Sequence, residues 1–87
     1  MEPLEVELDA FRVVAFDGRV LEIFGGAERR FHATLLTVTV SEPKKGQRHV
    51  TLEQSQRQND LLLDDAAFAK LQPILNALRS AGVAVNG

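Results

Sequence analysis

The stretch LLLDDAAFAKLQPILNALRSAG, residues 61–82, decides the fold of this chain. A short apolar run leads into Asp64 and Asp65, and either carboxylate can cap a helix by accepting bonds from free backbone N–H groups. From Ala66 to about Ala81, apolar residues recur at spacings of three and four, which predicts an amphipathic helix. Gly82 stands where a helix typically ends. The chain should therefore finish with one helix that closes a set of strands.

The apolar stripe of this helix is expected to enter the core. Its members are Phe68, Leu71, Leu75 and Leu78, with Ile74 beside them. Pro73 interrupts the pattern, because proline lacks the N–H that a helix interior uses. The sequence therefore predicts either a kink at Pro73 or a break after which Pro73 restarts the helix.

A hairpin around Asp17-Gly18 is the clearest local signal before the helix. An Asp-Gly pair between β-rich runs is typical of a two-residue turn, which would pair Phe16 with Arg19. One face of this hairpin then carries Val14, Phe16, Leu21 and Ile23, and the other carries Phe11, Val13, Val20 and Phe24. Both faces are apolar and both need cover. The second face is therefore a candidate interaction face, unless the helix and the other strands bury it.

Further strands are indicated on both sides of the hairpin. Residues 4–9 alternate apolar and acidic side chains, which favours a half-buried strand. Its acidic face is either simply solvated or a docking surface for a basic partner. A strand from Arg29 should continue, through an irregularity near residues 33–34, to Val40. Another strand covers residues 47–54, a turn is expected at 55–59, and residues 82–87 are expected to be a tail.

Composition bounds the classes of function. The 87 residues suit one domain, with a core from about residue 4 to 82, and 45% of them are hydrophobic. The net charge of −2 gives no electrostatic case for binding nucleic acid. The absence of cysteine excludes disulfides and thiolate metal sites. No apolar run is long enough for membrane insertion, and no secretory signal is present, so a cytoplasmic location is expected.

No constellation of residues indicates catalysis. His32 and His49 lack a nucleophile and an acid at recognisable spacing, and helix capping accounts for Asp64 and Asp65. No metal-ligand spacing and no glycine-rich phosphate loop is found. We expect a non-enzymatic protein without cofactor or metal; a small enzyme that uses Asp64 or a histidine is the remote alternative.

Anion or lipid-headgroup binding is the main alternative to protein contact. The basic turns supply its candidate residues: Arg29, Arg30, Lys44, Lys45 and Arg48. Because a strand separates the first two from the lysines, the two groups are expected at opposite ends of that strand rather than in one patch.

The order of these segments resembles bacterial pleckstrin-homology-like (PH-like) domains. The stretches that carry the resemblance are FDGRVLEIF, RRFHATLLTVTV, GQRHVTLEQ and FAKLQPILNAL, within residues 11–82. The resemblance implies an α+β fold in which a bent antiparallel sheet or partly open barrel of six to seven strands is closed by one C-terminal helix. It also implies a scaffold that binds a protein partner or self-associates. Phosphoinositide binding is not expected, because the loop at residues 17–19 has only one base and one acid.

Overall fold

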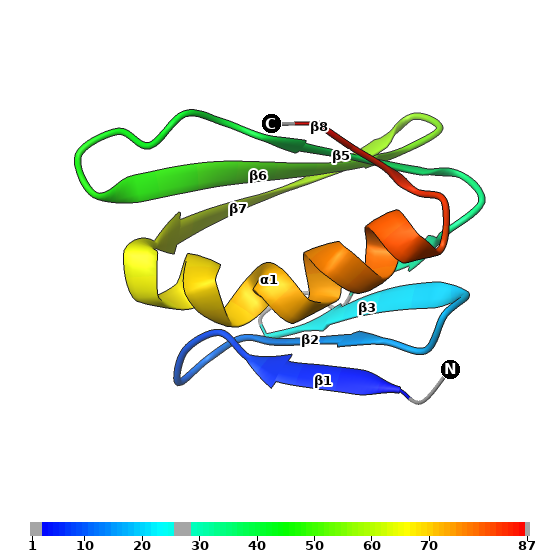
Figure 1. Cartoon of the computed structure of the whole chain (residues 1–87), viewed down its shortest axis with the longest axis horizontal. Helices are drawn as coiled ribbons and strands as arrows, with labels where there is room; N and C mark the ends of the chain where they lie inside the picture. Colours follow the sequence, from blue (N-terminus) through cyan, green and yellow to red (C-terminus); the bar gives the residue numbers. More distant parts are fainter. Residues whose placement is uncertain (1–2, 26–28, 87) are drawn as a thin grey trace.

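The computed structural model describes residues 3–25 and 29–86, which form an α+β fold of two four-stranded sheets and one helix (Figure 1). In chain order the elements are β1 (Leu4–Glu7), β2 (Val13–Phe16), β3 (Val20–Phe24), β4 (Arg29–His32), β5 (Leu36–Val40), β6 (Gln47–Gln54), β7 (Arg57–Asp64), α1 (Asp65–Ser80) and β8 (Ala84–Asn86). Sheet A has the order β1-β2-β3-β4, and sheet B has the order β7-β6-β5-β8. The expectation of one bent sheet or a partly open barrel is corrected: the two sheets are separate and do not close into a barrel.

The β2–β3 hairpin forms, but its register differs from the expected one. Phe16 pairs with Leu21 and not with Arg19. The Asp17 carboxylate accepts hydrogen bonds from the N–H groups of Arg19 and Val20, both at 2.8 Å. Gly18, with φ 99°, and Arg19 are therefore the central residues of the turn. Because the partners slide by two residues, each side chain keeps its predicted face.

The strand expected from Arg29 to Val40 is two strands in different sheets. A tight turn at residues 33–35 separates β4 from β5, and within it the Leu35 N–H donates to the His32 carbonyl at 3.0 Å. The buried side chain of Gln54, on sheet B, accepts a hydrogen bond from the His32 N–H of sheet A. This bond satisfies part of the free edge of β4 and ties the two sheets together.

Sheet B contains more residues than the sequence predicted, because β7 starts earlier and an additional strand, β8, follows the helix. Strand β7 begins at Arg57, so the turn before it is limited to Ser55 and Gln56, and Ser55 has a φ of 55°. The expected tail contains β8, which pairs parallel with β5. Sheet B is therefore mixed rather than purely antiparallel, and β8 covers the edge that β5 would otherwise expose.

Helix α1 has well-formed caps at both ends. Asp64 is the N-cap, and its Oδ1 accepts a hydrogen bond from the Ala67 N–H at 2.7 Å. After the helix, Gly82 has a φ of 88°, and the Val83 N–H returns to the Leu78 carbonyl at 3.0 Å. This pattern is a Schellman motif, whose apolar contact here joins two buried residues.

The helix is one continuous element through Pro73, so the predicted break is wrong. Proline leaves the carbonyl four residues earlier, that of Ala69, without its helical partner. Both Pro73 and Ala69 lie on the exposed face of the helix. Water can therefore solvate that carbonyl, which reduces the cost of the proline.

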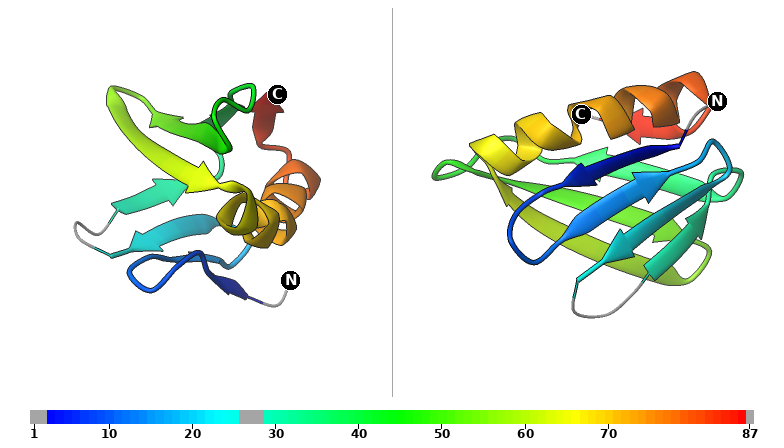
Figure 2. Two further views of the ribbon diagram at one scale, coloured as in Figure 1. Left: turned by 90° about the vertical axis from the view of Figure 1, so that its left-hand side faces the viewer. Right: turned by 90° about the horizontal axis from the view of Figure 1, so that it is seen from below.

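The core lies between the two sheets, and α1 fills the open side between them (Figure 2, left). Its helical contribution is Ala67, Leu71, Ile74, Leu75 and Leu78. Phe68, which was expected among them, is only half-buried, and the Arg48 guanidinium lies 4.5 Å from the centre of its ring. Phe68 therefore packs at the margin of the core, where the Arg48 guanidinium makes a cation–π contact with its ring.

Candidate interaction surface on sheet A

The outer face of sheet A carries the hairpin face that the sequence singled out. Residues directly opposite in neighbouring strands share a face, so the register builds three rows across the sheet. The rows are Glu7–Val13–Phe24, Glu5–Ala15–Glu22–Arg30 and Val20–His32. The opposite side chains, Val14, Phe16, Leu21 and Ile23, are buried in the core as predicted.

The described elements leave this outer face uncovered. Helix α1 packs on the inner side, and no other element crosses the outer face when the sheet is viewed from below (Figure 2, right). Phe11 is 83% exposed and Phe24 is 37% exposed, while Val13 and Val20 are half-buried. The structure thus places Val13, Val20 and Phe24 on the outer side of the sheet and Phe11 in the loop before β2, and solvent reaches all four.

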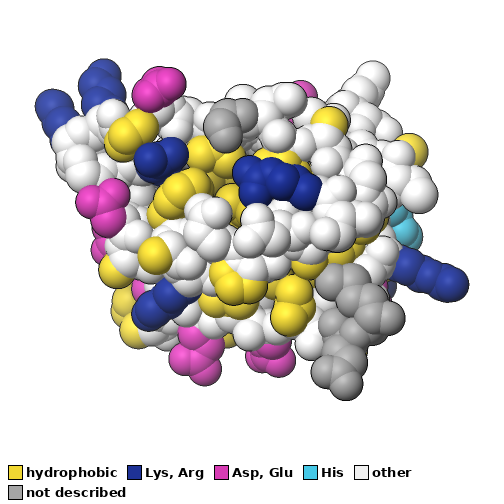
Figure 3. Space-filling view, viewed as in Figure 1, with side chains coloured by type: hydrophobic (Ala, Val, Ile, Leu, Met, Phe, Trp, Pro, Cys, Tyr) yellow, Lys and Arg dark blue, Asp and Glu magenta, His cyan; other side chains and the backbone are white. Residues whose placement is uncertain are grey.

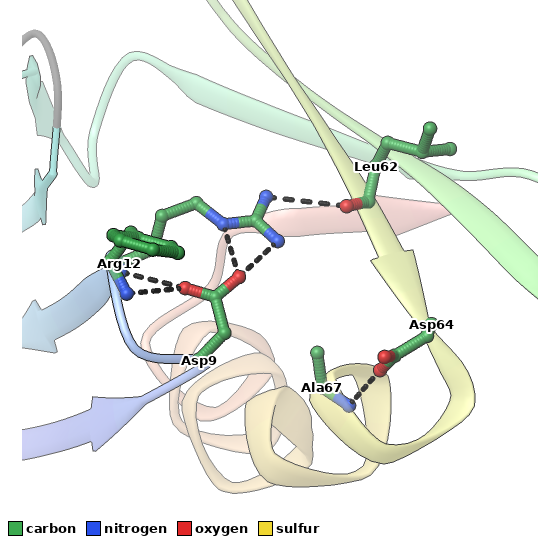
Figure 4. Close-up of polar contacts among 6 residues, drawn as sticks. Asp9, Arg12, Leu62, Asp64 and Ala67 are labelled. Atoms are coloured by element: carbon green, nitrogen blue, oxygen red, sulfur yellow. Dashed lines mark hydrogen bonds and ion pairs between the residues drawn. The ribbon is translucent and has the colours of Figure 1, made fainter.

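The loop that holds Phe11 is fixed by Asp9 (Figure 4). One carboxylate oxygen of Asp9 accepts from the N–H groups of Phe11 and Arg12, at 2.9 and 2.8 Å. The other oxygen accepts from Nε and Nη2 of Arg12, at 2.9 and 2.7 Å. These bonds, with the Arg12 side chain first and the Phe11 N–H next, hold the pKa of Asp9 below its ordinary value.

Two further contacts anchor the same loop to the rest of the fold. Nη1 of Arg12 donates to the Leu62 carbonyl on β7 at 3.2 Å, so the loop reaches from sheet A to sheet B (Figure 4). At Gly25, with φ 120°, an added Cβ would overlap the carbonyl oxygen of Phe11. The Phe11 backbone therefore lies against the residue that follows Phe24, and the two exposed phenylalanines belong to one end of the sheet.

The structure does not gather the predicted anion-binding residues into one site. Arg29 and Arg30 line a hollow of about 210 Å³, whereas Lys44 and Lys45 line another of about 560 Å³. The two hollows lie at opposite ends of the eight-residue strand β6, about 23 Å apart. Arg48 belongs to neither hollow, because it stacks over Phe68. Positive side chains on the helix-bearing face likewise lie in separate groups (Figure 3).

The hollow beside Phe24 includes a residue that the sequence did not indicate. Arg57, from the start of β7, joins Arg29 and Arg30 of β4, and Glu22 lies among them. Nη2 of Arg30 is 3.4 Å from a carboxylate oxygen of Glu22. Three guanidinium groups and one carboxylate therefore share a shallow surface site made by both sheets.

The residues considered for catalysis lie in different places. Asp64 is occupied by helix capping. Nε2 of His49 is 3.3 Å from Asp60, and both side chains are about half exposed on sheet B. His32 lies on sheet A, beside Arg19 and the end of α1. Within residues 3–25 and 29–86, no three His, Asp or Glu side chains are grouped to hold a metal ion.

The important residues that sequence reasoning missed are Asp9, Arg12 and Arg57. An Asp three residues before an Arg at the end of a strand is a weak signal, because the pair acquires its role only when β7 lies beside it. Arg57 lies in the segment 55–59, which was expected to be a turn, so its place at the start of β7 was not predicted.

Comparison with known proteins assigns no family: no protein-family model, no curated protein and no solved structure matches the chain. In the described part of the chain, no helix has the length and apolar character needed to cross a membrane.

Proposed function

We propose that this chain is a non-enzymatic binding module that contacts a protein through the outer face of sheet A. The single observation that carries this proposal is Phe11, which is 83% exposed on a loop that Asp9 holds by hydrogen bonds. An exposed aromatic side chain costs little to bury, and a loop that is already ordered loses little conformational entropy on binding. Aromatic anchors of this kind dominate the affinity of protein interfaces.

The order of elements also supports a PH-like module. Sheet A is a four-strand meander, β5 to β7 form a second meander, and α1 follows, which is the order that the resemblance implies. The additional parallel strand β8 departs from it. The loop between β1 and β2 has a single base, Arg12, which is already bound to Asp9 and Leu62. This arrangement favours a protein over a phosphoinositide as the ligand.

Photo-crosslinking in the cells that encode the chain tests the proposal. A benzophenone amino acid replaces Phe11 in the loop between β1 and β2, and in the control it replaces Thr39, which lies on the outer face of sheet B. We expect a discrete adduct from position 11 that excess unlabelled wild-type chain competes away. The Phe24→Asp variant should compete poorly. Equal yields from both positions, or equal competition by both chains, would contradict the proposed surface.

Anion binding remains a second candidate function because Arg57 joins Arg29 and Arg30 around one hollow. Guanidinium groups are well suited to phosphate, which they can bind through paired N–H donors. The probe is inorganic phosphate, titrated at constant ionic strength and followed by amide NMR shifts. Shifts should centre on β4 and the start of β7 and disappear in Arg57→Gln, but persist in Lys44→Gln. Uniformly small shifts would argue against the site.

A further inference from the structure

The outer face of sheet A is divided by charge across its width. Strand β1, at one edge, presents Glu5 and Glu7, whereas β4, at the other edge, presents Arg30. The half-buried Val13 and the exposed Phe24 lie between these edges. The face therefore has an acidic border at β1, a basic residue at the β4 border, and a middle that is apolar except for Glu22 on β3.

A surface with this layout complements a copy of itself in one orientation. Two copies can meet face to face about a two-fold axis that lies in the interface, either along the strands or across them. An axis across the strands places β1 of one copy on β1 of the other, acid against acid. An axis along the strands places the acidic border of each copy on the basic border of the other.

We infer that the partner at this face is a second copy of the chain, related by a two-fold axis along the strands; this inference rests on the proposed function. The observed register then sets the contacts. Glu5 lies opposite Arg30 of the second copy, because both residues belong to one row. In the next row, Val13 lies opposite Phe24 of the second copy.

Glu22 is the remaining charged residue of the row that contains Glu5 and Arg30, and it fits the same arrangement. Glu22 lies one strand inside Arg30 and contacts it within the monomer at 3.4 Å. In the dimer, Glu22 faces Ala15 of the second copy, so no carboxylate meets another carboxylate there. Each favourable charge contact occurs twice because of the two-fold symmetry.

The small area of the outer face of sheet A limits the strength of the association. Four short strands at a spacing of about 4.8 Å give a footprint on the order of 300 Å² per copy, to which the Phe11 loop adds. Stable complexes bury about 800 Å² per partner, so this is a weak interface. We expect a dissociation constant between about 1 µM and 1 mM, which becomes larger at high salt.

Charge-reversal variants test the pairing by sedimentation equilibrium of the purified chain. Glu5→Arg and Arg30→Glu should each weaken self-association about tenfold, because each change acts twice and turns attraction into repulsion. An equimolar mixture of the two variants should associate about as tightly as the wild type. Glu53→Arg, on the outer face of sheet B, is the matched control and should leave association unchanged. Circular dichroism verifies that each variant is folded.

Three results would overturn the inference. A wild-type chain that stays monomeric at about 1 mM excludes the second copy. Single variants that self-associate like the wild type exclude the charge pairing. A mixture of Glu5→Arg with wild type that associates better than either alone places the axis across the strands. The adduct from position 11 separates the two proposals: twice the chain's mass supports the second copy, whereas a different mass leaves only the general proposal standing.

Discussion

Leu75 is one of the fully buried side chains through which the helix should stabilise the fold, and Leu75→Ala tests this role. Leu75 is 1% exposed in the middle of α1, within the core between the two sheets. The substitution removes three buried carbon atoms, at about 0.8 kcal/mol each, and leaves a cavity whose cost adds to this loss. We expect the free energy of unfolding to fall by about 3–4 kcal/mol. The total free energy of unfolding for a chain of 87 residues is about 4–13 kcal/mol.

Urea unfolding followed by circular dichroism at 222 nm measures this change, since the chain has no Trp or Tyr to give fluorescence. The midpoint should fall while the dependence on urea concentration stays constant, and the melting temperature should drop by roughly 12–30 °C. Leu62→Ala is the matched control because Leu62 is 54% exposed, and it should cost less than about 1 kcal/mol. Equal losses in the two variants would refute the placement of α1 between the sheets.

Three further predictions concern loops and caps. Asp64→Ala should lower stability by about 1 kcal/mol through loss of the N-cap bond, measured by urea unfolding; Asp64→Ser should recover most of it. Gly25→Ala should destabilise the fold and shift the amide NMR signals of the loop before β2, because the added Cβ meets the Phe11 carbonyl; normal signals and stability would contradict this packing. The lowered pKa of Asp9 means that its carboxylate stabilises the folded loop above about pH 4 and that this contribution is lost as the pH falls through the folded pKa. Asp9→Asn should therefore be less stable than the wild type at pH 7, and this loss of stability should be smaller at pH 3. An equal loss at both pH values would count against the Arg12 contact.

The sequence predicted which face of the sheet each side chain occupies better than it predicted which residues pair between strands. The alternation of side chains put Val14 and Leu21 in the core, and a register error of two residues left this result unchanged. The register itself depends on the Asp17 side chain, which takes two backbone N–H groups and shifts the turn by one residue. Helix capping was equally local, so Asp64 and Gly82 could be read directly from the sequence.

Features that depend on contacts between distant segments could not be read from local pattern. The apolar run through residues 35–40 looked continuous with β4, yet the turn at 33–35 sends it into the other sheet. The short segment 84–86 has little strand signal of its own, and its pairing with β5 makes it a strand. The candidate face was identified from its apolar residues, but the role of Arg12 follows only from its bond to Leu62.

The parallel pairing of β8 with β5 has a consequence for how the chain folds. The two strands come from the middle and the end of the sequence, and α1 lies between them. Their pairing requires a long loop to close, so it is expected late, after the helix has docked. Until then β5 offers an unpaired backbone edge to any neighbouring chain. Yield on refolding should therefore depend on protein concentration, even though the native molecule has this edge covered.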